Sequence, residues 1–299
     1  MTSIGVVIVT YRGGETVAVG LDALRRARDN LDGNSDVTVV VVDNASRDGT
    51  VERVRKVAPW VNLVELPRNV GFAAACNVGI ARSQEAGVVV LLNPDVEVRE
   101  DFLARVVALE WRSDIAAVGP AVLDGGGQVE QSARGFPRAG TALLGRTSLF
   151  ARLWPTSPLL RRDLRATPDQ GARTVDWVSG ACMVVPRERF QSVGPLDSGY
   201  FMYWEDADWC RRASYAGYSV IYDPTLVVTH RQGASSRSRS AATIISFHRS
   251  ALRYWRKHVA RSPASTTAAA VALGARCALK LIALGARRAL ACGRRGVEP

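Results

Sequence analysis

Paired cysteines are missing from this sequence. Its five cysteines lie far apart and form no Cys-x-x-Cys pair. This spacing suggests neither a disulfide framework nor a zinc site, and it fits a reducing compartment. Disorder is not expected, because 47% hydrophobic and 22% charged residues are ordinary values for a globular chain.

Targeting and membrane-spanning signals are also missing. The chain passes from Met1 into a strand-like apolar run with no basic segment before it, so we expect no signal peptide and a cytoplasmic location. The long uncharged stretch near the C-terminus is rich in Ser, Thr and Ala, and we expect no spanning helix there.

The sequence also lacks a dinucleotide fingerprint. That fingerprint places Gly-x-Gly-x-x-Gly directly after the first strand, where this chain has Tyr11-Arg12-Gly13-Gly14. A nicotinamide enzyme is therefore not expected.

The excess of positive over negative charge is confined to the tail. Residues 231–299 carry 14 Lys and Arg against the single acid Glu298, whereas residues 1–230 carry 25 bases and 27 acids. A cationic tail on a near-neutral body points to an anionic surface or a lipid phosphate, with nucleic acid as the competing partner.

The first part of the chain alternates strand and helix patterns. Repeated strand–helix–strand units predict an α/β fold, with a mostly parallel sheet covered by helices on both faces. Ligands of such sheets sit at the carboxyl ends of the strands. The predicted pairs of strand and helix are Gly5–Thr10 and Glu15–Asn30, Val37–Asp43 and Gly49–Val57, Val61–Leu66 and Gly71–Gln84, and Val88–Leu92 and Glu100–Arg112.

The pattern changes after a strand predicted at Ile115–Val122. Asp124–Gln128 is typical of a turn, and Ala133–Gln170 is a long irregular stretch of the kind that is usually functional or mobile. Later we expect ordered structure to return at Val175–Pro186. A helix at Trp204–Ala216, strands at Tyr218–Tyr222 and Leu226–His230, and helix from Ser246 with a break near Ser262-Pro263 are expected after it.

The second strand delivers a carboxylate and an amide, Asp43 and Asn44, to its end. A carboxylate at this place can accept a hydrogen bond from the N–H of a pyrimidine. The alternative is that an acid here caps a turn or a helix. We favour base recognition for Asp43 and capping for Asp48.

The triplet Asn93-Pro94-Asp95 follows the strand Val88–Leu92. Proline ends the strand ladder, and an acid after it can hold a hard divalent cation on a diphosphate. The same triplet also occurs as a plain turn, so it needs support from other features.

The most acid-dense window holds Glu205, Asp206 and Asp208 among aromatic side chains. An aromatic ring provides a flat apolar surface on which a sugar ring can pack. Partial burial raises the pKa of a carboxylate toward the value that a general base needs. The alternative is an acidic cluster favoured by a helix N-terminus. On a helix Glu205 and Asp208 share a face that Asp206 does not, so we expect different roles.

His230 closes the predicted strand Leu226–His230 and precedes a loop. A single histidine is more often simply hydrogen-bonded than a ligand. His230 becomes a candidate ligand only in the context of the other strand-end residues.

Taken together, these segments resemble the family 2 glycosyltransferases of GT-A fold, and within them the rhamnosyltransferase-like group. The resemblance runs from about Ile4 to about His258, and its specificity lies in the ordered set, because no single motif is decisive. The segments that carry it are Val7–Tyr11, Val42–Ser46, Asn69–Ala73, Leu92–Val96, Ser179–Ala181, Trp204–Asp208 and Thr229-His230.

The resemblance implies roles for individual residues. Asp43 would read the nucleotide base. Asp206 would deprotonate the acceptor hydroxyl, and Trp204 or Glu205 would help to hold the acceptor. The further nucleotide-sugar contacts that we expect on this basis are Thr10, Tyr11, Arg12, Arg68, Asn69, Gly71 and Asn93.

The resemblance also implies a metal site. Asp95 would hold Mg²⁺ or Mn²⁺ on the diphosphate, and His230 would complete the site. Many relatives have Asp-x-Asp where this chain has Asn93-Pro94-Asp95, so this turn supplies only one charged ligand and metal affinity is expected to be modest. The Asn-Pro-Asp form is usual in the rhamnosyltransferase-like group.

We therefore expect an inverting glycosyltransferase. The favoured donor is dTDP-L-rhamnose, and the favoured acceptor is a polyprenyl-diphosphate-linked amino sugar of bacterial wall or surface-glycan assembly. UDP-galactofuranose and UDP-N-acetylhexosamine are the alternative donors.

We expect a glycosyltransferase domain over residues 1–240 and a basic helical extension over 241–299. The extension is interpreted as a membrane-surface helix that brings the enzyme to the inner face of the cell membrane and to its acceptor. Oligomer packing is the rival, because apolar residues surround more than half of the last helix. The first part of the extension carries a basic ridge on one helix, which consists of Arg249, Arg253, Arg256 and Lys257. Its last part carries a narrow basic stripe along the final helix, which consists of Arg276, Lys280, Arg287 and Arg294.

Two other classes of function compete. A nucleic-acid-binding α/β protein would use the basic tail and Arg237–Ser240, but it leaves the strand-end acids unexplained. A nucleotidyltransferase would normally have a Gly-rich phosphate loop with Lys or Arg after the first strand, and Arg12-Gly13-Gly14 is a poor match.

Overall fold

The computed structural model describes residues 3–31, 35–137, 171–231 and 240–295, with side chains up to residue 287. Within these residues nine strands form one mixed sheet, and two further strands form a separate ribbon. The strands are β1 (Ile4–Thr10), β2 (Val37–Asp43), β3 (Asn62–Glu65), β4 (Val88–Leu92), β5 (Val96–Val98), β6 (Ile115–Asp124), β7 (Ala133–Arg134), β8 (Arg173–Val175), β9 (Trp177–Val178), β10 (Cys182–Pro186) and β11 (Ser219–His230). The helices are α1 (Gly14–Asp29), α2 (Thr50–Val57), α3 (Phe72–Arg82), α4 (Phe102–Val107), α8 (Arg187–Ser192), α9 (Glu205–Tyr215), α11 (Ala241–Tyr254), the π-helical turn η2 (Trp255–Val259) and α12 (Pro263–Arg295).

The first half of the sheet is the predicted parallel unit. β1 pairs in parallel with both β2 and β4, and β2 pairs in parallel with β3. The chain moves outward from β1 to β3 and then returns to place β4 on the other side of β1, so the strand order reverses at β1 and β4. A reversal of this kind opens a ligand crevice at the carboxyl ends of the strands.

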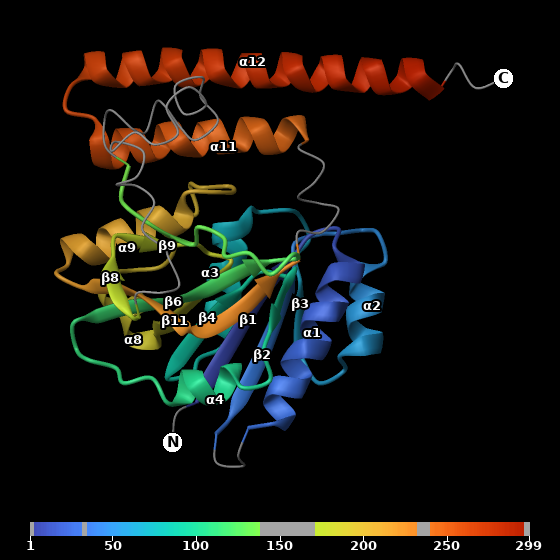
Figure 1. The fold of residues 1–299 in the computed structure, drawn as a ribbon, viewed down its shortest axis with the longest axis vertical. Helices are drawn as coiled ribbons and strands as arrows, with labels where there is room; N and C mark the ends of the chain where they lie inside the picture. The colour runs from blue at the N-terminus through green and yellow to red at the C-terminus, as the bar shows by residue number, and fades with distance from the viewer. Residues whose placement is uncertain (1–2, 32–34, 138–170, 232–239, 296–299) are drawn as a thin grey trace.

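The second half of the sheet is mixed. β10 is antiparallel to both β4 and β6, β11 is parallel to β6, and β5 is antiparallel to β11. As a result β1, β2, β4, β6 and β11 all run in one direction and end at the same edge of the sheet (Figure 1).

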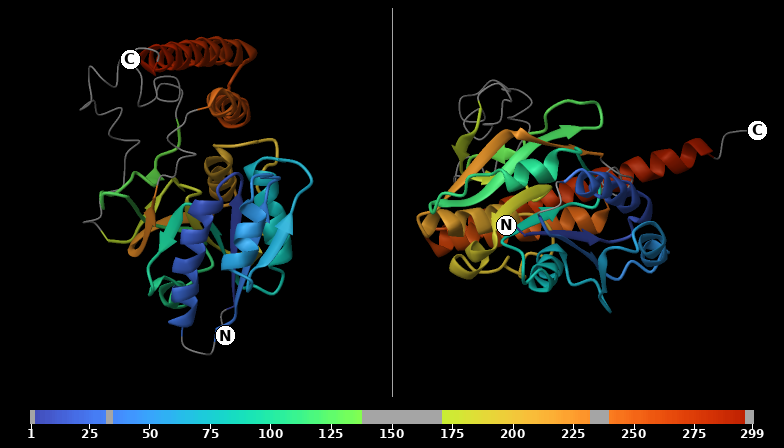
Figure 2. Two further views of the ribbon diagram at one scale, coloured as in Figure 1. Left: turned by 90° about the vertical axis from the view of Figure 1, so that its right-hand side faces the viewer. Right: turned by 90° about the horizontal axis from the view of Figure 1, so that it is seen from below.

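Helices cover both faces of the sheet. One buried cluster joins the sheet to α1, α2 and α4, and the other joins it to α3, α8 and α9. All residues of β1 and β4 are buried, which explains their continuous apolar sequences. The predicted α/β fold with a mostly parallel sheet is therefore confirmed (Figure 2).

The C-terminal helices stack on the rest of the molecule as a pair. α11 lies next to the body of the protein, and α12 runs across α11 on the side away from the sheet (Figures 1 and 2). The predicted break is present, because Ser262 precedes α12 and its Oγ accepts a hydrogen bond from the Ser265 N–H at 3.2 Å. Helix begins at Ala241, five residues before the predicted start.

Several predicted elements differ in detail. The two strands expected at Tyr218–Tyr222 and Leu226–His230 are one strand, because a bulge between Asp223 and Val227 absorbs the intervening residues. The ordered segment expected at Val175–Pro186 contains β9, β10 and the last residue of β8. The helix expected at Glu100–Arg112 is limited to α4, and β5 was not predicted.

α12 also corrects the expectation that no helix could span a membrane. Its segment Pro263–Arg287 is long and apolar enough to do so by length and composition, with a mean hydropathy of 1.7 and 11% of its most apolar window buried. These two properties do not distinguish a spanning helix from one that lies on a surface. Most of the predicted loop Ala133–Gln170, residues 237–239 and the side chain of Arg294 lie outside the described residues.

Candidate active site

The sheet brings the predicted strand-end residues to one edge. Thr10 ends β1, Asp43 ends β2, Asn93 follows β4 and His230 ends β11. These strands share one direction, so the four positions lie along the same border of the sheet. The N-terminus of α9, which carries Asp206, faces this border through a hydrogen bond to the Gly180 backbone before β10.

Asp43 is 3% exposed and stabilises the turn that follows β2. Its Oδ2 accepts a hydrogen bond from the Ser46 N–H at 3.0 Å, and its Oδ1 accepts one from the Ser46 hydroxyl. Ser46 Oγ in turn accepts the Arg12 N–H at 2.9 Å and so joins the ends of β1 and β2. A carboxylate has about four acceptor positions, so Asp43 keeps capacity for a further donor.

The backbone around Asp43 is strained. Arg12, Ala45 and Arg47 have φ values of 53°, 64° and 53°, in the left-handed region that non-glycine residues rarely adopt. Strain of this kind is concentrated at ligand sites. Asp48 has the capping role that we favoured for it, because its Oδ1 accepts hydrogen bonds from both the N–H and the hydroxyl of Thr50.

A second loop at this edge contains Asn69 and Gly71. Asn44 holds it, because its Oδ1 accepts the Val70 N–H at 2.9 Å and its Nδ2 donates to the Gly71 carbonyl at 3.2 Å. Asn69 Oδ1 accepts the Gly71 N–H at 3.0 Å. Gly71 has φ 88°, and a Cβ there would lie 2.7 Å from the Phe201 carbonyl oxygen, so only glycine fits.

The remaining predicted donor contacts differ in exposure. Tyr11, Arg12 and Arg68 are exposed at this edge of the sheet. Thr10 is buried, and its hydroxyl has no hydrogen-bond partner within the described residues. An unpaired buried hydroxyl at a strand end is a candidate ligand contact.

Asp95 and His230 lie side by side. The antiparallel pairing of β5 with β11 sets His230 opposite Val96, directly after Asp95. Asp95 Oδ1 is 3.1 Å from His230 Nε2, and Glu130 Oε2 is 3.2 Å from His230 Nδ1. Burial lowers the pKa of His230, but the hydrogen bonds and charges of Asp95 and Glu130 outweigh it and raise the pKa to about 10.

The pair fits one divalent cation. Neighbouring ligands of an octahedral cation, each at about 2.1 Å, lie about 3 Å apart, close to the 3.1 Å between Asp95 Oδ1 and His230 Nε2. No group of three or more His, Cys, Asp and Glu in the described ranges is arranged as a metal site. Two protein ligands would leave the other positions to diphosphate oxygens and water.

Glu130 was missed at the sequence level. The turn after β6 folds the chain back, so that the Glu130 N–H donates to the Val122 carbonyl at 2.7 Å and its side chain reaches His230. The turn signal at Asp124–Gln128 marked this reversal, but nothing in the local sequence marked the contact.

The acid-rich loop enters α9 through strained backbone. Tyr203 and Trp204 have φ values of 69° and 73°. Asp206 Oδ2 accepts the Gly180 N–H at 2.8 Å, and Oδ1 accepts the Ala207 N–H at 2.7 Å. These two hydrogen bonds fix the carboxylate at the start of β10.

Burial controls the protonation of Glu205 and Asp206. Burial and then the charge of Asp206 raise the pKa of Glu205 well above its usual range. Burial also raises the pKa of Asp206, against the opposing effects of its backbone hydrogen bonds and of Arg134. Glu205 Oε2 has no hydrogen-bond partner within the described chain.

Asp208 has a different environment, as its place on the helix predicted. It is fully buried and bonds to Tyr200, Arg212, Lys257 and His258. Burial raises its pKa, but these hydrogen bonds and charges lower it further, and the net pKa is well below the usual range. Asp208 therefore joins α9 to η2.

Trp204 packs against α11. Its ring centroid lies 5.1 Å from that of Tyr254 and 5.8 Å from that of Phe247. Its neighbours Phe201 and Tyr203 are exposed by 44% and 39%. Of the aromatic residues in this loop, these two offer more open surface to an acceptor than Trp204 does.

Comparison with known proteins shows which family the chain belongs to. The model described as "Glycosyl transferase family 2" matches residues 5–156. An N-acetylglucosaminyl-diphospho-decaprenol L-rhamnosyltransferase of Mycobacterium tuberculosis is 31% identical over 82% of this chain and 81% of its own length. A dTDP-rhamnosyl transferase, RfbF of Shigella flexneri, is 24% identical over 73% of this chain and 67% of its own length.

Solved structures share the fold. GalNAc-T7 with UDP, GalNAc and Mn²⁺ superposes with a TM-score of 0.60 at 18% identity, over 85% of this chain, which spans only 48% of that protein. The mannosyltransferase PcManGT of Pyrobaculum calidifontis, in complex with GDP-Man and Mn²⁺, gives a TM-score of 0.56 at 21% identity, over 96% of this chain and 80% of that one. Both are GT-A enzymes. The chain belongs to glycosyl transferase family 2 and is a glycosyltransferase of GT-A fold.

Proposed function

We propose that this glycosyltransferase moves L-rhamnose from dTDP-L-rhamnose to a polyprenyl-diphosphate-linked N-acetylamino sugar, in the assembly of a wall or surface glycan. The observation that carries the proposal is the 31% identity over 82% of the chain with a relative named for that acceptor and that sugar. A dTDP-rhamnosyl transferase among the relatives supports the nucleotide. Family membership also accounts for the strand-end acids, which a nucleic-acid-binding protein leaves unexplained.

The donor would lie along the carboxyl edge of β1, β2 and β4. Asp43 has free acceptor capacity for a base N–H, and the unpaired Thr10 hydroxyl lies beside it. Asp95 and His230 would hold Mg²⁺ or Mn²⁺, which when bound neutralises charge on the departing diphosphate. Two neighbours of the same fold contain Mn²⁺, which supports a divalent metal without choosing between the two ions.

Asp206 is the proposed base. It would take the proton of the acceptor hydroxyl while that oxygen forms a bond to the anomeric carbon. The bond from that carbon to the diphosphate oxygen breaks on the opposite side, and the electron pair leaves with the nucleotide. One displacement inverts the anomeric centre. The two backbone N–H groups that hold Asp206 fix its direction, and its raised pKa suits proton uptake.

Glu205 is proposed to contact the acceptor. Its carboxyl is buried, and Oε2 has no protein partner within the described residues. With its pKa raised, the group is protonated over a wider pH range and can donate a hydrogen bond to a sugar oxygen.

We also propose that α12 lies on the inner face of the cell membrane. Val271, Leu279 and Ile282 are each about two-thirds exposed and lie within about 80° of one another on the helix. Arg276 and Lys280 lie on the side nearer α11, where the Lys280 Nζ is 5.9 Å from the Phe247 ring centroid. A charge at the centre of a bilayer costs about 2.5–3.5 kcal/mol, so two mid-helix bases favour a surface position over a spanning one.

Calorimetric titration tests the donor. The purified chain is titrated with dTDP-L-rhamnose, UDP-galactofuranose and UDP-N-acetylglucosamine, each with and without Mn²⁺. We expect metal-dependent binding of dTDP-L-rhamnose, and an inverted linkage when the product is examined by NMR. Selective binding of either UDP-sugar would replace the proposed donor, and a retained anomeric configuration would contradict the mechanism.

A further inference from the structure

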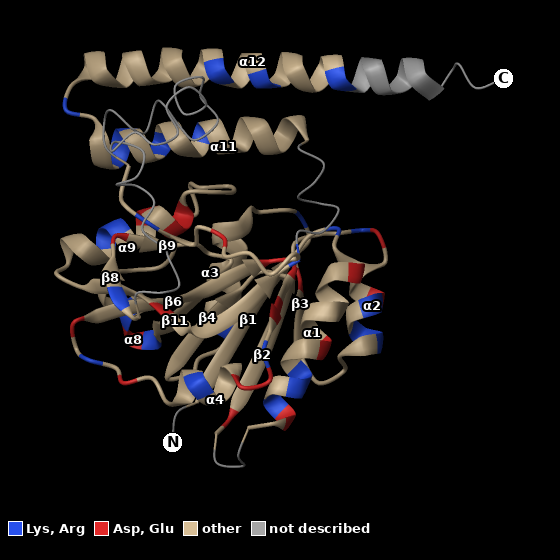
Figure 3. Cartoon of the chain, in the orientation of Figure 1, with Lys and Arg blue, Asp and Glu red and all other residues tan. Residues whose placement is uncertain are grey.

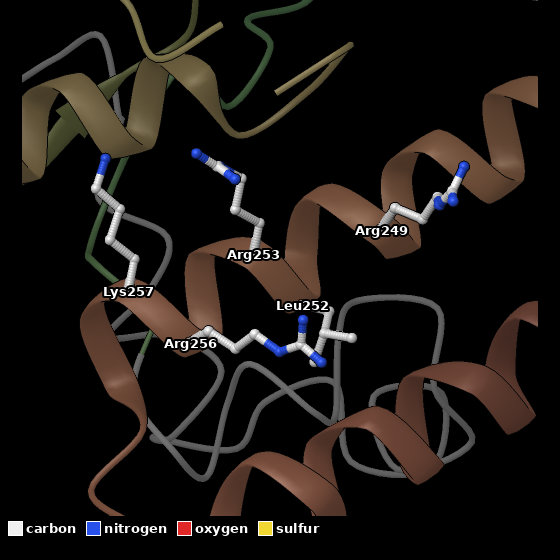
Figure 4. Close-up of a pocket in the computed structure, with 5 residues that line it drawn as sticks. All are labelled: Arg249, Leu252, Arg253, Arg256 and Lys257. Atoms are coloured by element: carbon white, nitrogen blue, oxygen red, sulfur yellow. The ribbon is translucent and has the colours of Figure 1, made fainter. Parts of the chain in front are cut away.

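One face of α11 and η2 carries a basic hollow. Its volume is about 450 Å³, and its lining within the described residues comes from a single helical face. The lining side chains are spaced three or four residues apart, as a helix face requires. We call this set the α11 hollow, and it consists of Arg249, Leu252, Arg253, Arg256 and Lys257 (Figure 4).

The α11 hollow has more positive charge than the protein neutralises. Arg253 and Lys257 extend toward α9 and form ion pairs with Asp197 at 2.9 Å (Figure 4). Arg249 and Arg256 are exposed, and in the described part of the chain neither forms an ion pair. Two cations paired with Asp197 and two free guanidinium groups on one helical face favour an anion with several oxygens, because guanidinium groups bind phosphates bidentately.

The hollow is also connected to the loop that carries the proposed base. Ser250, beside Arg249, donates a hydrogen bond from its hydroxyl to the Met202 carbonyl at 2.9 Å. Tyr254, beside Arg253, stacks on Trp204. An anion bound to this face of α11 therefore lies on the element that supports the acceptor loop.

The position of α12 suggests which anion this is. α12 packs along α11, and its exposed apolar residues point away from α11. Packed helices lie about 8–10 Å apart, so α11 would be one helix layer above a membrane that receives those residues. A sugar that is linked through a diphosphate to a prenyl chain in the membrane projects from the membrane surface toward that layer. Figure 3 shows Lys and Arg on both helices and no acidic residue on the described part of either.

We propose that the α11 hollow binds the diphosphate of the lipid-linked acceptor, with Arg249 and Arg256 as its free phosphate ligands. This assignment rests on the proposed acceptor class and adds a site to it. The hollow would hold the diphosphate while the sugar reaches the acceptor loop and the prenyl chain stays in the membrane. Its contribution is to acceptor binding and not to the chemical step.

The test compares two acceptors with the full-length chain. One is N-acetylglucosamine linked through a diphosphate to a short prenyl chain, and the other is an alkyl glycoside of the same sugar without phosphate. Arg249→Gln with Arg256→Gln should raise the KM for the diphosphate acceptor by about tenfold or more, since a hydrogen bond to a charged group contributes about 1.5–3 kcal/mol. The kcat, the donor affinity and the KM for the alkyl glycoside should not change.

The matched control is Arg261→Gln with Arg287→Gln. It removes the same charge from two exposed positions outside the hollow, Arg261 in the break between η2 and α12 and Arg287 on α12. It should leave the KM for both acceptors unchanged. Equal KM values for the hollow variant and the unaltered chain, or equal losses in both variants, would overturn the assignment.

Two further measurements separate this site from its alternatives. Inorganic pyrophosphate, titrated in EDTA, should bind the unaltered chain and bind the hollow variant about tenfold more weakly. This result holds even if no rhamnosyl transfer is found, so it separates failure of the site from failure of the proposed function. Vesicles with phosphatidylglycerol should bind both proteins equally. If the hollow variant loses vesicle binding while its acceptor KM is unchanged, the hollow binds membrane headgroups and the proposal is wrong.

Discussion

Glu205, Asp206 and Asp208 are close in sequence and differ in environment. Asp208 is surrounded by cations and stays ionised, because its pKa is lowered. Glu205 is buried, and its Oε2 has no hydrogen-bond partner among the described residues, whereas two backbone N–H groups hold Asp206 next to the start of β10. Of the three, Asp206 is the one that combines a raised pKa with two backbone hydrogen bonds to its carboxylate, one of them from Gly180 just before β10. This difference in environment supports our proposal that Asp206, and not Glu205 or Asp208, is the base.

The change Asp206→Asn should remove the base and keep the fold. The amide matches the carboxylate in shape and keeps one of its two hydrogen bonds from backbone N–H groups. General base catalysis contributes about 10²–10⁴-fold, so we expect kcat to fall by that factor. The Kd for the nucleotide sugar should not change. Asp48→Asn is the control, because Asn also caps a helix. Turnover of Asp206→Asn close to that of the unaltered enzyme would exclude this residue as the base.

The change Asp95→Ala should abolish the gain in donor affinity that Mn²⁺ provides. Asp95 is the only acid of its turn, so no second carboxylate there replaces it. Glu130→Gln should weaken metal-dependent binding by about tenfold, because outer ligands of a metal-bound histidine have effects of this size. Calorimetric titration with the nucleotide sugar, with and without Mn²⁺, measures the donor affinity of both variants. Donor affinity that is unchanged in Asp95→Ala would refute its assignment as a ligand.

Residues at strand ends could be predicted from the sequence, and their partners could not. Asp43 and Asp95 follow long apolar runs, so their position at the edge of a parallel sheet follows from the pattern. Glu130 and Gly180 reach His230 and Asp206 only through tertiary contacts over 100 and 26 residues. The local periodicity of a sequence does not predict contacts between residues this far apart. For the same reason the packing of Trp204 against α11 could not be predicted when Trp204 was assigned to acceptor binding.

At the scale of elements, α9 and the C-terminal helices are joined by Asp208. The carboxylate contacts Lys257 and His258 of η2 at 2.8 Å each, and Arg212 of its own helix at 3.0 Å. Removal of one member of a buried ion network leaves the others unpaired and costs about 3–5 kcal/mol. η2 therefore contributes to the position of the acceptor loop, although it lies beyond the predicted domain boundary at residue 240.

The change Asp208→Asn should lower the free energy of unfolding by about 3 kcal/mol at pH 7. Because the pKa is lowered on folding, the ionised form contributes stability above its unfolded pKa of about 3.9 and loses it at lower pH. The difference from the unaltered chain should therefore shrink below about pH 4. Urea unfolding measures this. Asp114→Asn, which breaks only an exposed pair with Arg112, should leave the free energy of unfolding close to that of the unaltered chain.

If Asp208→Asn and Asp114→Asn were equally stable, the Asp208 network would not hold η2 in place.

The parallel strands and the helices between them were predicted from their periodicity, because each buries a complete face. The bulge of β11 and the division of β8, β9 and β10 depend on pairing across the sheet, which a single strand pattern does not specify.

For the whole molecule, the sheet edge and the two C-terminal helices face each other. The near-neutral body carries the strand-end acids, and the bases gather on α11 and α12 (Figure 3). The structure changes the interpretation of the predicted basic stripe. Arg276 and Lys280 are half-buried on the side nearer α11, so the apolar residues of α12, and not these bases, are the ones available to a membrane.

The exposed apolar face of α12 gives the last prediction. Val271→Glu with Ile282→Glu should reduce binding to phosphatidylglycerol vesicles by about a hundredfold or more, because each change removes about 1.5–3 kcal/mol of apolar burial. Activity on a soluble acceptor should be retained. Val19→Glu with Val57→Glu, which replaces two exposed valines on the body, is the matched control and should bind vesicles normally.

Two outcomes would contradict a surface position for α12. If the unaltered chain is a dimer without membranes and the α12 variant is a monomer, in analytical ultracentrifugation, the apolar face is a subunit interface. If only detergent releases the unaltered chain from membranes, and alkaline carbonate does not, the helix spans the bilayer. Release by carbonate is expected, because a spanning helix would carry Arg276 and Lys280 into the bilayer at about 2.5–3.5 kcal/mol each, whereas a surface helix leaves both beside α11.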